Sequence, residues 1–323
     1  MVFLNRTGDT KLTNTIPLER PSPLMPRFAA VLSMLVLSSL AVAGRAEALA
    51  DDKDVPRLVS FGGACSKCDL SGRRLQNARF AGANFSYASL VDSDLRGATF
   101  LGSNFENARL TNADLRGAEM MGSNFGSANF TNAAMDGVEA PGASFIRAIL
   151  VNVSARGAEM PGANLSFANL TNARFTGAEM PGARMLSVDA RGADFNNADL
   201  DRAMMSSGRF DKASFRGASL VGAVLGGASF AAADFRGADM ERAMIQGANL
   251  SGARNLRQDQ IDETCGDDKT RLPQGLKVRL CRGPGSSRVI IVRSEPPAHP
   301  APPRPPKPPK APPPAPKMIV ASH

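Results

Sequence analysis

Residues 112–125 read NADLRGAEMMGSNF, and the spacing of the large apolar residues in this stretch decides the fold. Leu115, Met120 and Phe125 lie five residues apart, and a small residue stands two positions before each of them. The pattern runs without insertion through 37 units from Leu70 to Leu250, with Leu, Phe, Met, Ile or Ala at every position divisible by five. Helices and strands keep one face apolar with periods of 3.6 and 2, so a period of five predicts a chain that turns a corner in every unit.

The position two residues after each large residue supports such a corner. Between residues 72 and 252 it is Gly 19 times and Asn 7 times, and both residues enter positive φ at low cost. Three corners read Pro-Gly, at 141–142, 161–162 and 181–182, which is the sequence signature of a type II turn.

A second period, of 20 residues, indicates how many corners close one coil. Phe85, Phe105, Phe125 and Phe145 lie 20 residues apart, so four units would bring like residues over like residues. We therefore expect an all-β, four-sided solenoid of about nine coils, stacked at the β-strand spacing of about 4.8 Å. The large and small residues of each unit would fill its interior.

Three units depart from the pattern in a compensating way. Val replaces the small residue at 138, 153 and 188, and Ala replaces the large residue two positions later, at 140, 155 and 190. Overpacking and cavity formation are each destabilising, whereas the paired change roughly conserves volume. The pairing indicates that both positions face inward.

The A-[D/N]-[L/F]-x-G pattern, as in NADLRG (112–117), GADFNN (192–197) and GANLSG (247–252), resembles the pentapeptide-repeat family. The resemblance covers residues 68–252 and implies a right-handed quadrilateral β-helix, which we assign to residues 68–254. It implies little about activity, because family members with known roles are few and dissimilar. Some cytoplasmic members mimic duplex DNA and inhibit or protect a topoisomerase, which would require a strongly acidic rod.

The charge of this chain is distributed unevenly. Residues 69–255 carry 18 basic and 18 acidic residues, whereas residues 256–323 carry 12 basic and 6 acidic ones. A neutral repeat region has no field to attract nucleic acid, so we expect no nucleic-acid partner and disfavour DNA mimicry. The basic C-terminal segment could associate with acidic polymers.

The N-terminal region has the features of a secretory signal peptide. An apolar run at residues 28–43 follows Arg27 and precedes GRAEALA, and 16 residues are short for a bilayer-spanning helix. We assign residues 1–50 to the signal peptide, with cleavage between Ala50 and Asp51, although AEA two residues earlier would also serve. A start at Met25 would give a leader of conventional length. The expected location is periplasmic or secreted, with no transmembrane segment in the mature chain.

All four cysteines, Cys65, Cys68, Cys265 and Cys281, follow the leader, and an even number in an exported chain favours disulfides. The two pairs lie at opposite ends of the solenoid, so Cys265 is expected to pair with Cys281, and Cys65 with Cys68 unless that pair is free. The alternatives for Cys65 and Cys68 are a redox-active pair or part of a metal site, although neither a β-α-β context nor further ligands lie beside them. The repeat region contains no His, so we expect no catalytic residues, metal site or cofactor.

Two outward columns of the solenoid form a candidate binding ridge for a partner or a cation. One is a glutamate column and the other an apolar column at the next corner. The ridge comprises Glu119, Glu139, Glu159 and Glu179 with Leu101, Met121, Pro141, Pro161 and Pro181. The alternative is a solvated corner with paired charges, such as Arg116–Glu119 and Arg156–Glu159, which would add little stability. A further column, Asn84, Asn104, Asn124 and Asn164, is expected to form a hydrogen-bonded ladder.

The ends of a solenoid must be covered, because exposed edges invite polymerisation and offer a route to oligomers. We expect an N-terminal cap at residues 51–67 and a C-terminal cap with the cysteine pair at residues 255–293. In the latter, residues 257–264 would form a short helix that lays Leu256 and Ile261 on the last coil. Residues 294–323 would be a disordered, basic, Pro-rich tail with polyproline II character.

The sequence thus predicts a non-enzymatic exported scaffold. It would bind a protein or a cell-envelope polymer through its outer columns or its tail. The alternatives are a thiol-redox factor that uses Cys65 and Cys68 and, less favoured, a DNA-mimicking topoisomerase modulator.

Overall fold

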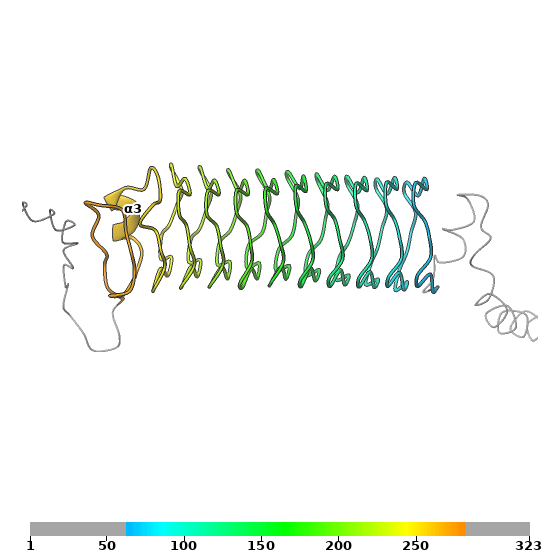
Figure 1. The fold of residues 1–323 in the computed structure, drawn as a ribbon, viewed down its shortest axis with the longest axis horizontal. Helices are drawn as coiled ribbons and strands as arrows, with labels where there is room; N and C mark the ends of the chain where they lie inside the picture. The colour runs from blue at the N-terminus through cyan, green and yellow to red at the C-terminus, as the bar shows by residue number, and fades with distance from the viewer. Residues whose placement is uncertain (1–62, 282–323) are drawn as a thin grey trace, which may run out of the picture.

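The computed structural model describes residues 63–281, which form an elongated rod (Figure 1). The segment assigned to a signal peptide (1–50) with the expected Ala50–Asp51 junction, residues 51–62 and 282–293, and the Pro-rich segment 294–323 lie outside the described residues. No helix within residues 63–281 is long and apolar enough to cross a membrane.

Parallel bridges join residues 20 positions apart and define the four sides of each coil. They begin with Ala64↔Asn84 and keep this spacing to Asp234↔Arg254, with one bridging residue on each side of each coil. The peptide groups on both sides of a bridging residue form hydrogen bonds. Around Asn104, for example, Ser103 O accepts from Asn124 N at 2.9 Å and Phe105 N donates to Asn124 O at 2.7 Å. The four-sided β-solenoid is therefore confirmed, and its bridging pattern already includes Ala64, within the segment assigned to the N-terminal cap.

The interior is filled by the two positions that the sequence pattern selects. Every large residue from Leu70 to Leu250 is at most 3 % exposed. Val138, Val153 and Val188 are completely buried together with their Ala partners, which confirms the inward register of the exceptional units.

Stacked rings continue the core from coil to coil. The ring centroids of Phe85, Phe105, Phe125 and Phe145 follow one another at 4.8, 5.0 and 5.1 Å. Rings at adjacent corners of one coil meet edge to face, as Phe100 and Phe105 do at 5.0 Å. Both arrangements are favourable for aromatic pairs.

The corners take a single backbone conformation, whatever residue occupies them. From Lys67 to Gly247, the second corner residue of every unit has φ between 53° and 69°. The Pro-Gly corners fit the expected turn, since Gly142 has φ 64° and Ala143 N donates to Ala140 O. Bulky residues such as Phe167, with φ 63°, adopt the same conformation because the hydrogen bonds to both neighbouring coils determine it.

The expected Asn ladder does not form along the rod. Within residues 63–281, its members have one mutual hydrogen bond, from Asn124 to Asn104 at 3.1 Å, and their side-chain oxygens accept from the next corner, as from Gly126 N. A longer ladder occupies the corner positions of positive φ, where the side chains of Asp92, Asn112, Asn132 and Asn152 are linked in sequence at 2.9–3.3 Å. Asn suits this corner because it tolerates the left-handed conformation and can bond to its neighbour.

Residues 255–281 leave the repeat at the C-terminal end of the described chain, where the short helix α3 (Gln258–Asp262) lies on the last coil (Figure 1). Ile261 is completely buried, and Leu256 packs against the core. The Gln260 side chain donates to Phe235 O and Ala238 O at 3.0 and 2.7 Å. This segment therefore supplies both apolar contacts and hydrogen-bond donors to the last coil, which is not followed by another repeat coil.

We predict that Val138 and Ala140 are energetically coupled. Val138→Ala should destabilise the rod by about 1–3 kcal/mol through a cavity, more than the about 0.5–1 kcal/mol expected for Ala133→Gly nearby. The double variant Val138→Ala with Ala140→Met makes this unit match the AEM units one coil before and after it, and should recover most of the loss. Thermal unfolding of the wild type, Val138→Ala, Ala140→Met, their double variant and Ala133→Gly checks this, and additive losses in the double variant would contradict the packing scheme.

Candidate functional site

The glutamate column of the ridge lies on one side of the solenoid. Successive parallel bridges connect Glu119, Glu139, Glu159 and Glu179 and then reach Asp199. All four Glu residues are exposed, and their spacing is that of adjacent strands, about 4.8 Å. Their carboxylates, if charged, repel one another along the column.

The apolar column lies at the corner that follows this side. Leu101 and Met121 are 41 % and 55 % exposed, Pro161 is exposed, and Pro141 and Pro181 are half-buried. Together the two columns form a strip that is acidic along one edge and apolar along the other.

The expected ion pairs between the ridge and the neighbouring arginines are wrong. Arg116 binds Asp114, with Nε–Oδ1 at 2.8 Å and Nη2–Oδ2 at 2.6 Å, and Arg96 binds Asp94 in the same way. Because each Asp stands two residues before its Arg, the guanidinium can form a bidentate contact with the carboxylate within one turn. Within residues 63–281, no ion pair involves Glu119 or Glu159. Glu119 instead accepts a hydrogen bond from the Thr99 hydroxyl at 3.4 Å.

The two aspartates that bind these arginines have lowered pKa values. The side-chain hydrogen bonds from Arg96 hold the pKa of Asp94 well below its usual range, and those from Arg116 lower the pKa of Asp114. These carboxylates thus stay charged in the folded state to lower pH than in the unfolded chain.

The Cys65–Cys68 disulfide spans one corner of the first described coil. Cys65 stands at a position divisible by five and is 4 % exposed, while Cys68 takes the next small inward position. The C-x-x-C spacing therefore equals the distance between two inward positions across a corner. The sequence already shows this register, because Cys65 and Cys68 stand at the large and small positions of the repeat. The two cysteines therefore belong to the core, whereas a redox-active C-x-x-C pair stands at the N-terminus of a helix.

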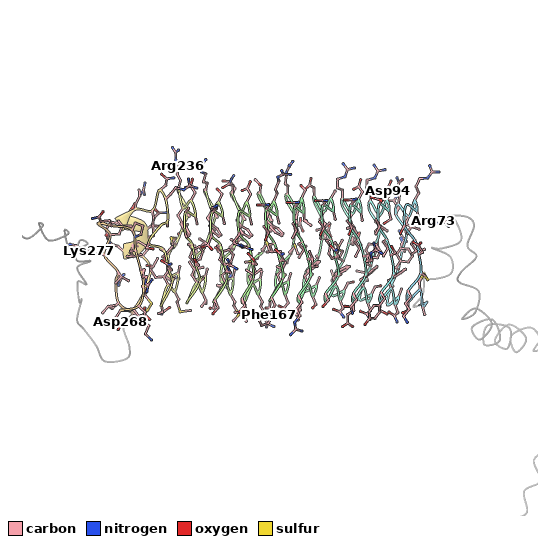
Figure 2. The ribbon with its side chains drawn as sticks, viewed as in Figure 1. Arg73, Asp94, Phe167, Arg236, Asp268 and Lys277 are labelled. Atoms are coloured by element: carbon pink, nitrogen blue, oxygen red, sulfur yellow. A yellow bond between two sulfur atoms is a disulfide. The ribbon has the colours of Figure 1, made fainter. Side chains whose placement is uncertain are left out.

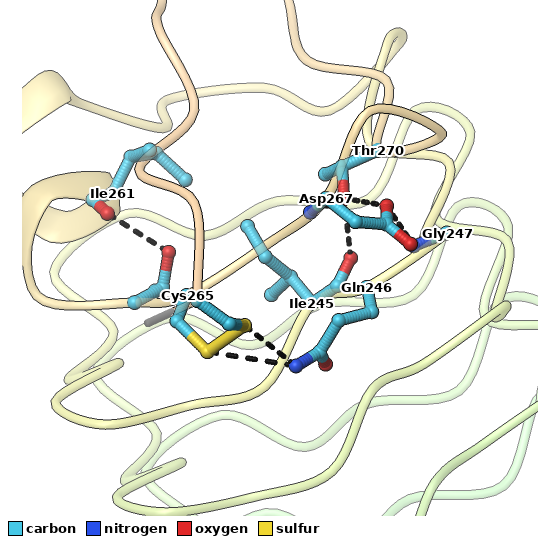
Figure 3. The surroundings of a disulfide bond; sticks show 9 residues. Ile245, Gln246, Gly247, Ile261, Cys265, Asp267 and Thr270 are labelled. Carbon is cyan, nitrogen blue, oxygen red and sulfur yellow. Dashed lines mark hydrogen bonds between the residues drawn. A yellow bond between two sulfur atoms is a disulfide. The ribbon is translucent and has the colours of Figure 1, made fainter. Parts of the chain in front are cut away.

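The Cys265–Cys281 disulfide ties the last described residue to the solenoid (Figure 3). Cys265 forms a bridge with Met244, and Gln246 Nε2 lies 2.7 Å from Cys281 Sγ. Asp267 Oδ1 accepts from Gly247 N at 2.8 Å, so a second contact holds the same loop. The disulfide joins two segments of the C-terminal region. It places Cys281 next to the side of the solenoid that contains Asn124 and Met244, which comes directly after the corner of the apolar column.

Two further surface features are a hollow and the exposed ring of Phe167. An open depression of about 460 Å³ is lined by Asn196, Asn197, Arg216 and Arg236 with two corner glycines. On the opposite edge of the rod, Phe167 is 56 % exposed with the Arg147 guanidinium 5.7 Å from its ring centre (Figure 2). No three His, Cys, Asp or Glu residues among 63–281 are grouped so that they could hold a metal ion.

The family model for pentapeptide repeats matches this sequence in eight copies within residues 65–139 and 148–254, more than half of the chain. The chain belongs to the pentapeptide-repeat family. Membership implies that the quadrilateral β-helix of this pentapeptide-repeat protein is right-handed, and the resemblance seen in the sequence is confirmed.

Two solved structures are among those that this chain is similar to, and the first is described as a pentapeptide-repeat protein. HetL from the cyanobacterium Nostoc sp. strain PCC 7120, involved in heterocyst differentiation regulation, is 21 % identical over 64 % of this chain and 91 % of its own, with a TM-score of 0.32. QnrB1, a plasmid-mediated fluoroquinolone resistance protein, is 20 % identical over 64 % of this chain and 94 % of its own, with a TM-score of 0.27. No curated protein matches the sequence. The family assignment therefore rests on the repeat match.

We predict that the Asp114–Arg116 pair contributes to the pH dependence of stability. Because the folded pKa of Asp114 is lowered, its stabilising effect is present above about pH 4 and is lost as pH falls towards the folded pKa. Asp114→Asn and Arg116→Gln should therefore each reduce the slope of unfolding free energy against pH between about pH 5 and pH 2. Thr111→Val, a neutral change at the preceding corner, is the control, and an unchanged slope in Asp114→Asn would refute the assignment.

Proposed function

We propose that this pentapeptide-repeat protein is an exported, non-enzymatic scaffold that binds a protein or a cell-envelope polymer through the ridge. The observation that carries the proposal is a row of four exposed Glu residues that form no ion pairs within residues 63–281, beside exposed apolar residues. A surface of this kind favours a partner that supplies cations along one line and apolar groups along a parallel line.

The chemistry of the surface supports binding rather than catalysis. The two His residues, His299 and His323, lie in the tail, so residues 63–281 offer no imidazole as a general base. The depression at Arg216 and Arg236 is open, whereas catalytic sites exclude water from the reacting groups. The Arg216 guanidinium there binds Asp234 at 2.7 Å.

The thiol-redox alternative has weaker support. Cys65 and Cys68 occupy inward positions, and Cys65 is 4 % exposed, whereas a reactive cysteine needs access and a stabilised thiolate. DNA mimicry has weaker support still, because the Glu column is flanked by arginines and the repeat region as a whole is neutral.

The ridge proposal predicts that neighbours in the native envelope change when its charge is removed. Proximity labelling with the full-length protein should lose its specific neighbours in Glu139→Gln with Glu159→Gln. The control Glu106→Gln with Asp268→Asn removes two exposed charges at other corners of the rod and should retain them. An unchanged set of neighbours in the ridge variant would contradict the proposed binding surface.

Export is the part of the proposal that rests on the leader. We predict that the mature protein recovered from the producing cells begins at Asp51, which N-terminal sequencing would detect. An intact N-terminus that retains the apolar run at 28–43 would contradict export with cleavage.

A further inference from the structure

The tail contains a cation at every third residue. Residues 304–310 read RPPKPPK, with two Pro between successive cations. A polyproline II helix has three residues per turn and rises about 3.1 Å per residue, so Arg304, Lys307 and Lys310 would project from one side about 9.3 Å apart. The prolines would occupy the other two sides.

The ridge has a matching period. Adjacent coils are separated by about 4.8 Å, so every second Glu of the column recurs after about 9.6 Å. The two periods differ by about 0.3 Å per step, far less than the reach of a Lys or Glu side chain. The apolar column runs parallel to the glutamate column at the adjoining corner.

We propose that residues 302–310 of the tail lie along the ridge of the same chain, with their cations over the glutamate column and their prolines against the apolar column. This inference rests on the proposed binding role of the ridge and names the class of its ligand. That ligand is a polyproline II segment with a cation at every third residue, and the chain's own tail is the occupant in the isolated protein.

The place where the described chain ends favours docking within one molecule. Cys281 is bonded to Cys265, and Cys265 continues the side of the solenoid that contains Asn124 and Met244. The chain enters this side directly after the corner of the apolar column. The 22 residues between Cys281 and Arg304 can extend over about 70 Å, whereas Asp199 lies only about three coils, or about 14 Å, from the C-terminal end of the rod. The tether is thus long enough to reach every Glu of the column.

The period match specifies which carboxylates the two lysines meet. Because the tail enters from the C-terminal end, Lys310 lies towards lower-numbered coils than Lys307. Their partners should be two coils, hence 40 residues, apart. The expected pairs are Lys307 with Glu179 and Lys310 with Glu139, or Lys307 with Glu159 and Lys310 with Glu119.

Zero-length cross-linking with a carbodiimide tests the proposal on the full-length purified protein. The reagent joins a Lys Nζ to a Glu carboxyl as an amide, and the water removed is taken up by the carbodiimide as its urea. An equal mixture of unlabelled and ¹⁵N-labelled protein separates links within one chain from links between chains. Peptide mass spectrometry should show same-chain links in the 40-residue register, at least about fivefold above links to Glu106 and Asp268, which lie at another corner. They should weaken in 1 M salt, where the screening length falls to about 3 Å.

A tail variant provides the matched control. Exchanging two residues by Pro306→Lys and Lys307→Pro keeps composition and charge but moves the central cation to another side of the helix. The ridge links of that lysine should fall at least about threefold, whereas Glu106→Gln should leave the wild-type pattern intact.

Three results would overturn the proposal. They are links mainly between differently labelled chains, links spread evenly over off-ridge carboxylates, and links insensitive to the exchange. If these links fail while native neighbours still depend on Glu139 and Glu159, only the tail inference is lost. If the links form and the neighbours do not change, the tail docks but the proposed partner surface is wrong.

Discussion

From Lys67 to Gly247, each corner of the solenoid places one residue near φ 60°, and the rest of the structure depends on this turn. A turn of this kind every five residues leaves two side chains pointing inward and three outward in each unit. The inward pair fills the square interior, and the backbone groups of each side bond to the coils before and after. Glycine satisfies the turn at no steric cost, but bulky residues such as Phe167 are also held there by the ladder on both sides.

The same geometry determines what the surface can do. Residues 20 apart stand over one another at about 4.8 Å, so any outward residue that recurs with this period becomes a column. Amides gain from this arrangement, as the ladder through Asn112 and Asn132 shows. Carboxylates do not, because like charges repel, so a column such as Glu119–Glu179 gains from an external or tail-borne cation. Binding along columns, rather than chemistry in a cavity, is the function that such a surface supports.

Much of the fold could be predicted from residue spacing. The period of five determined the inward positions, the period of 20 determined the number of sides, and the Val138–Ala140 exchange supported both. The positions of Cys65 and Cys68 could also have been recognised as inward, because they follow the same register. Outward contacts were less predictable. Arg116 has carboxylates on both sides in the sequence, at Asp114 and Glu119, and spacing alone does not say which one it binds.

What the sequence determined by itself is the register, because steric volume allows only one assignment of large and small residues to the inside of a closed square. What only the tertiary structure decided is how the outward side chains pair and where the chain leaves the rod. Asp114 binds Arg116 because the corner brings the guanidinium back over the preceding side, and the Glu column is left without that partner. Cys281 lies beside the end of the Asn124–Met244 side because residues 255–281 fold back on the last coil. These outcomes depend on distances between coils and between side chains, which a one-dimensional repeat does not contain.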